Sequence, residues 1–357
     1  MKRLSDKRKN WLDLKCDQDQ RRSEQLARQQ RHPKNSKNSL RNTTVIVSIP
    51  AKLVAELETH RLKLLDVVHQ MSRALQNPRT RVKLDFSKVE RMFPGGTLML
   101  LALVQLHVEL YPGRIKASCP PGSLPAQLLR HFGFGEALGI PLQGNSPRHP
   151  DVINWEYLTD EWADGAKVSA LLGKYRELIN AELPDDLYAV LTEGITNVRH
   201  WAYPTNCDVP HSMRRWWMFS RYVEPPKGGL GNLFIAIYDI GVGIPETLSA
   251  KLKLTEKVVE VVEKVTGSHH LDKTLLAQAV DHKRSSTGQT NRGKGLPEMK
   301  EFIQNTEGGR LYIVSGHAQY SCVPAENYSG AQKCHIAFPG TLILWSLPLK
   351  EKDEHHE

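Results

Sequence analysis

Segments with the two-residue period of a strand alternate with segments that have helical spacing from about residue 44 onward, and this alternation constrains the fold more than any other feature. The run TVIVSIP predicts a strand, apolar residues at helical spacing follow it, and RVKLDFS predicts a second strand. A turn is expected at FPGG, followed by a buried helix in TLMLLALVQLHVEL and a strand in RIKASCP. Ser123 and Pro125 predict the start of another helix. The pattern indicates a small α/β domain.

The length and the charge distribution suggest how the chain is divided. A chain of 357 residues exceeds what one hydrophobic core usually supports, so two domains are expected. The net charge of +9 is concentrated in residues 1–41, which hold thirteen Lys and Arg against five Asp and Glu and few large apolar side chains, so this stretch is expected to be disordered. The expected organisation is a basic flexible tail at 1–43, an α/β domain at 44–143, a linker at 144–168, a second domain at 169–350 and a charged tail at 351–357.

Composition also bears on the compartment and the partners. No apolar run approaches the roughly 20 residues that a membrane span needs, and the basic amino terminus lacks the apolar centre of a signal peptide. The five cysteines form no C-x-x-C pair and indicate neither a zinc site nor a disulfide framework. We therefore expect a cytoplasmic protein with no membrane partner. The basic tail could hold nucleic acid by charge alone, but a solubilising extension explains it as well, so nucleic acid is not favoured.

The run LTEGITNVRHWAYP places a carboxylate and a carboxamide four residues apart, at Glu193 and Asn197. Apolar residues at helical spacing predict that the opposite face of the same helix is buried. On the polar face an acid could polarise a water for attack on a phosphoryl group, and an amide oxygen suits Mg²⁺. An isolated pair at this spacing is more often a solvated helix surface, so a functional interpretation needs support from other parts of the chain.

Three further motifs occur later in the chain. In FIAIYDIGVG a strand delivers Asp239 to its end, where a carboxylate could accept a hydrogen bond from an exocyclic amine, and Gly241 and Gly243 allow a flat ligand to approach closely. Taken alone, this motif is more simply a tight turn. In NRGKG the glycines and a lysine at the mouth of a helix converge on an anion such as phosphate. In FPGTLILWSLPL, Thr341 introduces an alternating strand.

Together the four motifs resemble the GHKL superfamily, the ATP-binding fold shared by histidine kinases, anti-sigma-factor kinases, type II topoisomerases, mismatch-repair proteins and a heat-shock chaperone. The resemblance covers about residues 170–350 and implies a Bergerat-type α/β sandwich, with a mixed sheet on helices and with ATP and Mg²⁺ as cofactors. It implies that Glu193 is the general base, Asn197 the Mg²⁺ ligand and Asp239 the reader of adenine. The other residues that it places at the nucleotide are Gly241, Gly243, Arg292, Gly293, Lys294, Gly295 and Thr341.

Two departures from the family pattern concern the phosphate end. Many kinase members end the first motif with His-Ala or His-Gly, whereas Trp201 stands directly before Ala202 here and His200 is displaced by one residue. Lys294 stands where leucine is common among histidine kinases. Neither departure removes Glu193, so hydrolysis or phosphoryl transfer remains the expectation.

The segment VKLDFSKVERMFPGGTLMLLALVQL resembles the middle of a STAS-type domain, the fold of anti-sigma-factor antagonists. In phosphorylated members of that family an acceptor Ser or Thr stands just before the Gly that opens the helix. If Gly96 is that Gly, Gly95 occupies the acceptor position and Thr97 is the nearest hydroxyl. The expectation is an interaction module without chemistry of its own.

The branch of the superfamily is indicated by the regions that surround the motifs. Members with a large second domain are disfavoured because the chain ends soon after Thr341, and a conventional histidine kinase is disfavoured because the best acceptor, His69, lacks an adjacent acid. We expect an enzyme, an ATPase or protein kinase of GHKL type, that acts on a protein partner in a regulatory, partner-switching role. The alternative is a non-catalytic switch that binds ATP to fix a lid, roughly residues 246–291, against its partner.

Overall fold

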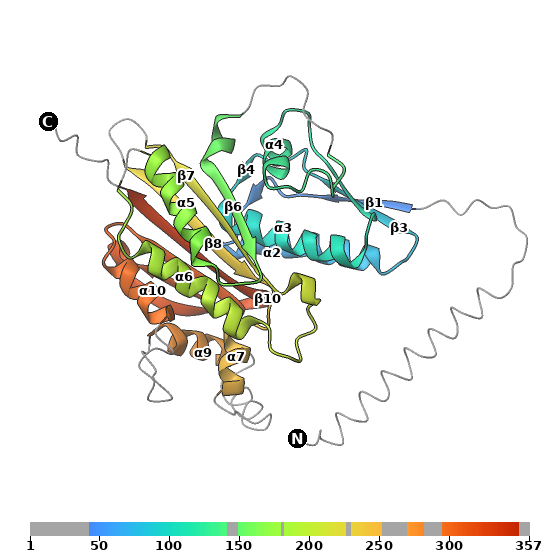
Figure 1. The fold of residues 1–357 in the computed structure, drawn as a ribbon. Helices are drawn as coiled ribbons and strands as arrows, with labels where there is room; N and C mark the ends of the chain where they lie inside the picture. Colours follow the sequence, from blue (N-terminus) through green and yellow to red (C-terminus); the bar gives the residue numbers. More distant parts are fainter. Residues whose placement is uncertain are drawn as a thin grey trace, which may run out of the picture. The chain divides into compact units, whose positions relative to one another are not determined.

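The computed structural model describes residues 43–140, 149–179, 182–225, 230–251, 270–281 and 295–349. Within these ranges the chain has an α/β fold with separate parallel and antiparallel sheets (Figure 1). The α/β class expected from the alternating pattern is therefore confirmed. The basic tail expected at 1–43 lies outside the described residues except for its last residue.

The amino-terminal part is built from two small parallel sheets and three helices. The first sheet has the order β1-β3-β5 and the second pairs β2 with β4. The strands are β1 (Thr43–Ser48), β2 (Lys52–Leu53), β3 (Thr80–Asp85), β4 (Arg91–Met92) and β5 (Ile115–Ser118). The helices are α2 (Glu58–Leu75), α3 (Pro94–Leu110) and α4 (Leu124–His131). The Ser123 hydroxyl accepts a hydrogen bond from the Ala126 amide, so the predicted start of α4 is confirmed.

The remainder of the chain forms a five-stranded sheet with the order β6-β7-β8-β10-β9. Its strands are β6 (Trp155–Asp160), β7 (Trp216–Val223), β8 (Gly231–Asp239), β9 (Arg310–Val323) and β10 (Tyr328–Leu349). The helices are α5 (Gly165–Leu178), α6 (Leu187–Asn197), α7 (Ile244–Lys251), α9 (His270–Asp281) and α10 (Gly295–Gln304), and α6 continues as one π-helical turn, η2 (Val198–Ala202). Short 3₁₀ segments are η1 (Pro150–Asn154), η3 (His211–Met213) and η4 (Pro324–Glu326).

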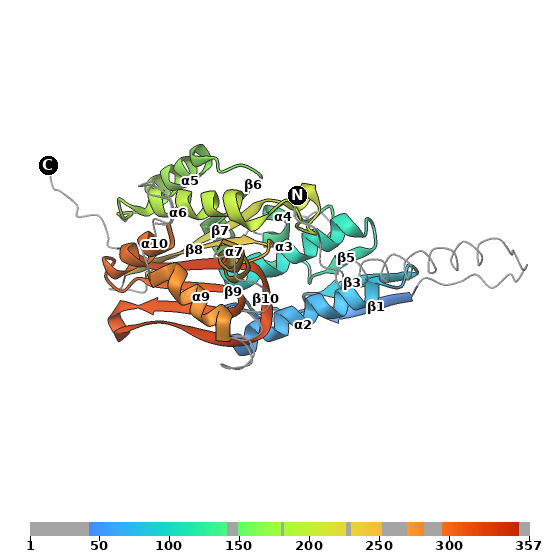
Figure 2. The same cartoon turned by 90° about the horizontal axis from the view of Figure 1, so that it is seen from below.

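Alternate residues of the large sheet enter two different hydrophobic layers. Trp216 and Ile237 face a layer that includes apolar residues of α5, α6, α9 and α10. Trp217 and Tyr238, one residue along each strand, face a layer shared with α2, α3 and α4. Figures 1 and 2 show these two sets of helices on opposite sides of the large sheet. Because successive strand side chains point to opposite faces, both faces of this sheet are buried.

Helix α3 lies between the small parallel sheets and the large sheet. It contacts α2 and β2 as well as β7, β8 and β10. The turn predicted at FPGG is wrong, because Pro94 is the first residue of α3 and both glycines lie in its first turn. A Cβ on Gly96 would overlap the Leu53 carbonyl, and one on Gly95 would lie 2.9 Å from Leu344 Cδ1. The two glycines therefore let the start of the helix pack against neighbouring chain.

Two expectations about the second half need correction. Residues 144–168, predicted as a linker, include η1, the edge strand β6 and the start of α5. The segment resembled a linker because an edge strand pairs on one side only and here has mostly half-buried side chains. The large sheet was expected to be mixed, but all its strand pairs are antiparallel. A single helix between neighbouring strands commonly gives a parallel pair, whereas two helices lie between β6 and β7.

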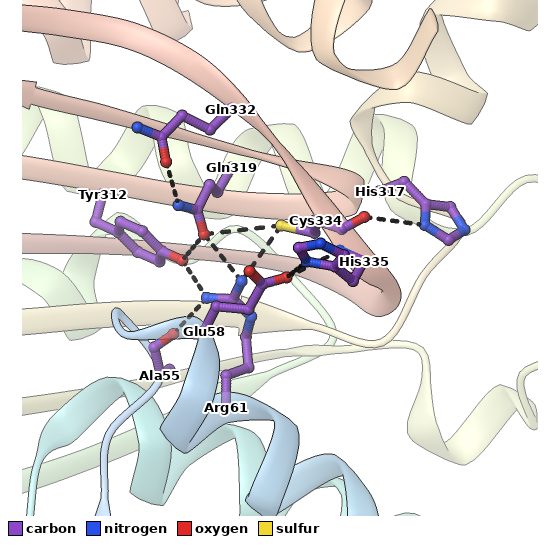
Figure 3. A network of polar contacts seen from close by, with 9 residues as sticks. All are labelled: Ala55, Glu58, Arg61, Tyr312, His317, Gln319, Gln332, Cys334 and His335. Atoms are coloured by element: carbon purple, nitrogen blue, oxygen red, sulfur yellow. Dashed lines mark hydrogen bonds and ion pairs between the residues drawn. The ribbon is translucent and has the colours of Figure 1, made fainter. Parts of the chain in front are cut away.

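The amino-terminal part and the large sheet form one compact unit, and they share one of the two hydrophobic layers. A buried polar network also joins them (Figure 3). Arg61 of α2, 2% exposed, donates hydrogen bonds to the Ala55 carbonyl at 2.7 Å, to Gln319 Oε1 at 2.9 Å and to the Tyr312 hydroxyl, and it lies 3.3 Å from Cys334 Sγ. The guanidinium thus links α2 to β9 and β10 through several neutral acceptors.

Candidate functional site

Asp239 ends strand β8 in a buried position, with only 4% of the residue exposed. Its Oδ1 atom accepts a hydrogen bond from the Gly241 amide at 2.8 Å, and its neighbour in the ladder is Thr341 of β10. Burial raises the pKa of this carboxyl to about 7, although backbone hydrogen bonds from Gly241 and Thr341 partly offset the rise. No cationic side chain of the described residues contributes to the shift. The carboxylate is therefore buried without a balancing charge.

The turn after Asp239 is held against the end of the η2 helix. The Ile240 amide donates to the Tyr203 hydroxyl at 3.2 Å, and the Val242 amide donates to the Ala202 carbonyl at 2.9 Å. A Cβ on Gly241 would overlap that same carbonyl, so only glycine fits here. The Tyr203 hydroxyl in turn donates to the Arg215 carbonyl at 2.6 Å.

A serine outside the predicted motifs connects the parts of this end of the site. Ser315 of β9 has no exposed surface, and its Oγ accepts a hydrogen bond from the Ile244 amide at 2.9 Å. The same atom lies 3.0 Å from the Gly340 carbonyl and 3.0 Å from the Thr341 hydroxyl. Gly243 has φ +86°, and a Cβ there would lie 2.8 Å from Ser315 Oγ. The glycine turn and the Gly340–Thr341 pair are thus joined through one hydroxyl.

Glu193 and Asn197 lie one turn apart on α6, as their spacing predicts. Leu187, Val190, Leu191, Gly194, Ile195 and Val198 form the buried face of this segment, so that prediction is confirmed. Burial raises the pKa of Glu193, the charge of Glu298 raises it further, and the Asn197 side chain partly lowers it. Asn197 Nδ2 is itself buried without a hydrogen-bond partner among the described residues. The helix therefore carries a partly buried acid with a raised pKa next to an amide that interacts with it.

The first residue of α10 approaches Glu193 closely. A Cβ on Gly295 would overlap the Glu193 carboxylate, so the acid lies directly at the amino-terminal end of α10. Free amides and the helix dipole make such an end favourable for negative charge. Arg292, Gly293 and Lys294, the other residues expected at the phosphates, lie outside the described residues.

One continuous helical segment connects the two ends of the candidate site. Glu193 meets Gly295 near its middle, and Ala202 holds the Gly241 turn at its end, nine residues later. At about 1.5 Å per residue the two contacts are separated by about 13 Å along the axis. The structure thus brings Glu193, Asn197 and Gly295 together at one end and Asp239, Gly241, Gly243 and Thr341 at the other.

Sequence reasoning missed Ser315 and Tyr203. Ser315 interrupts an apolar strand pattern, LYIVSGH, where a buried serine gives no distinct signal. Tyr203 stands inside the first motif, but its role depends on Ile240 and Arg215, which are distant in sequence. Thr97, considered as a phosphorylation site, has no exposed surface, so a kinase cannot reach it in this fold.

The described residues include no group of three or more His, Cys, Asp or Glu side chains arranged to hold a metal ion. The side-chain oxygen of Asn197 is the type of ligand that Mg²⁺ prefers, and an ion that is also held by phosphate oxygens needs fewer protein ligands. None of the helices in these segments combines the length and apolar character needed to cross a bilayer. No protein-family model matches the chain, and neither does any curated protein or solved structure.

Proposed function

We propose that residues 169–350 form a GHKL-type ATP-binding domain that hydrolyses ATP, or transfers its γ-phosphate to a protein partner, in a regulatory role. The observation that carries the proposal is the buried Asp239 carboxylate, which lies at a strand end beside a glycine turn and has no balancing cation. Burying an uncompensated carboxyl destabilises a fold, so its retention is expected where a ligand uses it. The proposed Bergerat-type sandwich is supported by the helices on one face of the antiparallel sheet.

Asp239 would recognise the base of the nucleotide through a hydrogen bond. The turn amides of Ile240, Gly241 and Val242 already donate within the protein, whereas the carboxylate, which accepts from the Gly241 and Thr341 amides, has further lone pairs with which to accept from a ligand. A carboxylate accepts hydrogen bonds and, when ionised, cannot donate one, so it favours an exocyclic amine such as that of adenine. Gly241 and Gly243 keep the turn free of side chains beside it.

Glu193 and Asn197 would act at the phosphates. Asn197 would hold Mg²⁺ through its side-chain oxygen, and the ion would neutralise phosphate charge. Glu193 would accept the proton of an attacking water, or of a partner's hydroxyl, as that oxygen bonds to the γ-phosphorus and the bond to the β,γ-bridging oxygen breaks. The raised pKa of Glu193 brings its basicity closer to neutrality, which suits a general base. The amino-terminal end of α10, with Gly295, would bind phosphate together with Arg292, Gly293 and Lys294.

A second candidate is a non-catalytic switch that binds ATP and changes its hold on a protein partner. The contact between Glu193 and Gly295 favours it, because an acid that occupies the helix end occupies the place expected for phosphate. In this alternative, nucleotide binding would displace Glu193 and move α10, with no bond broken. Both candidates bind ATP, and only the first breaks the bond between the γ-phosphorus and the β,γ-bridging oxygen.

Incubation with γ-labelled ATP and Mg²⁺ distinguishes these functions. Release of labelled phosphate, or label on a partner, that is lost in Glu193→Gln with ATP binding retained supports the catalytic proposal. Binding without turnover supports the switch, and absence of binding rejects both. Glu298→Gln is the matched control, since it removes the same charge from the neighbouring helix. It should retain turnover and move the acidic limb of the pH profile to lower pH, because the Glu298 charge raises the pKa of Glu193.

A further inference from the structure

Ser315 lies at the end of the site that holds Asp239 and Thr341, where three strand or turn segments meet. It belongs to no predicted motif. It is fully buried on β9, and its hydroxyl contacts the Ile244 amide, the Gly340 carbonyl and the Thr341 hydroxyl at 2.9, 3.0 and 3.0 Å. A hydroxyl has one proton to donate and two lone pairs to accept with. Its three neighbours therefore determine how the proton is used.

The hydrogen bonds of Ser315 form a closed set. The Ile244 amide can only donate, so it occupies one lone pair of Ser315 Oγ. The Gly340 carbonyl can only accept, so it takes the single proton of Ser315. The remaining bond, to Thr341, must then use the proton of Thr341 and the second lone pair of Ser315. The Thr341 hydroxyl is left with lone pairs alone for any further contact.

Thr341 and Asp239 are neighbours across the ladder between β8 and β10. We propose that Ser315 is a positioning residue that fixes the Thr341 hydroxyl as an acceptor, so that it and the Asp239 carboxylate together select a 6-aminopurine and reject a 6-oxopurine. This inference rests on the proposed function, which already assigns adenine to Asp239, and adds a buried residue on which that preference depends. A 6-oxo group would place an acceptor against two acceptors, whereas a 6-amino group supplies donors. Ser315 touches the base in neither case and acts through Thr341.

The test compares ATP with inosine triphosphate, whose base carries a 6-oxo group in place of the 6-amino group. Both are titrated calorimetrically into the full chain with Mg²⁺ at pH 8, using the wild type, Ser315→Ala, Thr341→Val and the double variant. Ser220→Ala is the matched control, because Ser220 is also a buried serine of the large sheet and accepts a hydrogen bond from the Tyr175 hydroxyl at 2.8 Å, away from the site. Thermal unfolding confirms that each variant is folded.

The wild type should prefer ATP by about 100-fold or more, and Ser315→Ala should reduce this preference about tenfold. Thr341→Val should reduce it similarly, and adding Ser315→Ala to Thr341→Val should change it no further, because the serine acts through the threonine. Ser220→Ala should leave the preference unchanged. If Ser315 had only a structural role, Ser315→Ala would weaken the binding of both nucleotides equally and leave the ratio of their affinities unchanged. That result would overturn the inference. Equal wild-type affinities overturn it while ATP binding stands, and no binding of either nucleotide overturns the proposed function with it.

Discussion

The amino-terminal part, residues 43–140, and the large antiparallel sheet, residues 149–349, use their buried polar groups differently. In the amino-terminal part the buried Arg61 donates to several acceptors and the two glycines of α3 allow close packing, although Thr97 Oγ1 has no hydrogen-bond partner among the described residues. In the large sheet Asp239 is buried without a balancing charge, Asn197 Nδ2 has no hydrogen-bond partner among the described residues, and Glu193 is partly buried beside a like charge. Natural folds break local rules mainly at functional sites. The difference favours a structural role for the first part and supports the chemistry that we propose for the second.

The largest expected effect concerns Glu193. Glu193→Gln should reduce phosphate release or transfer by about 10²- to 10⁴-fold, the usual contribution of a general base, and change ATP affinity little. Because the pKa of Glu193 is raised, wild-type turnover should fall as the pH decreases through a value above the usual 4.5. Single-turnover rates across pH measure both effects. Unchanged turnover in Glu193→Gln would show that Glu193 is not the general base.

Asp239→Asn should stabilise the unliganded protein while abolishing ATP binding. The pKa of this carboxyl is raised from 3.8 to about 7, so its contribution to stability is fully present below pH 3.8 and is lost as the pH rises through 7. An asparagine side chain cannot ionise, so the variant should gain up to about 4 kcal/mol over the wild type at pH 8, reduced by about 1 kcal/mol if its amide nitrogen replaces an oxygen that accepts from the Gly241 or Thr341 amide. The nearby Tyr203 and Tyr238 have raised pKa values and stay protonated there.

Denaturant unfolding at pH 5 and pH 8 tests whether Asp239→Asn raises the free energy of unfolding. The increase should be smaller at pH 5. Asp85→Asn is the matched change in the amino-terminal part. Asp85 Oδ1 and Oδ2 accept hydrogen bonds from the Ser87 amide and hydroxyl at 3.1 and 3.0 Å. Asp85→Asn should lower the free energy of unfolding by about 1 kcal/mol or less, because an amide nitrogen cannot accept a hydrogen bond. Stabilisation by both changes, or by neither, would remove the contrast between the two parts.

Gly96→Ala should destabilise the fold by about 1–3 kcal/mol, since the added methyl overlaps the Leu53 carbonyl. The affinity of the folded protein for ATP should not change if the amino-terminal part is structural. Gly173→Ala is the control, because Gly173 lies inside α5 with open space around it, and the change should stabilise by about 0.5–1 kcal/mol. Urea unfolding and ATP titration of both variants check the pair. A loss of affinity in folded Gly96→Ala would assign the amino-terminal part a role at the site.

The smallest effect is expected at Glu58, three residues before Arg61 on α2. Burial alone would raise the pKa of Glu58, but hydrogen bonds from the His335 amide and ring give a net decrease. Its contribution is therefore present above the usual pKa of 4.5 and is lost as the pH falls below that value. Glu58→Gln should change the unfolding free energy by less than about 1 kcal/mol at pH 7, because the His335 side chain is 82% exposed. A larger loss would show that this pair, and not only Arg61, joins the two parts.

The sequence predicted well those features that depend on short-range patterns. Helical periodicity identified the buried face of α6, and alternation identified β3 and β8. Prediction from the sequence failed for β6 and for the start of α3. An edge strand and a glycine-containing first turn are stabilised by packing partners that are distant in the chain.

Within the candidate site, spacing predicted that Glu193 and Asn197 share one helix face. The ladder that pairs Asp239 with Thr341 depends on register, which a single strand pattern does not determine. Ser315 and Tyr203 could not be predicted either, because each acts through residues of other segments. The hydroxyl contacts that complete the site therefore required the fold.

Calorimetric titration of the full chain with ATP and Mg²⁺, in two pH 7 buffers with different ionisation heats, tests the central claim most directly. Because burial raises the pKa of Asp239 to about 7, part of the carboxyls carry a proton near neutral pH, so an amine donor that needs the ionised form should bind with net release of protons. We predict saturable binding whose heat differs between the buffers, and loss of that difference in Asp239→Asn together with most of the affinity. No binding heat at millimolar ATP, or equal affinity in Asp239→Asn, would contradict the account.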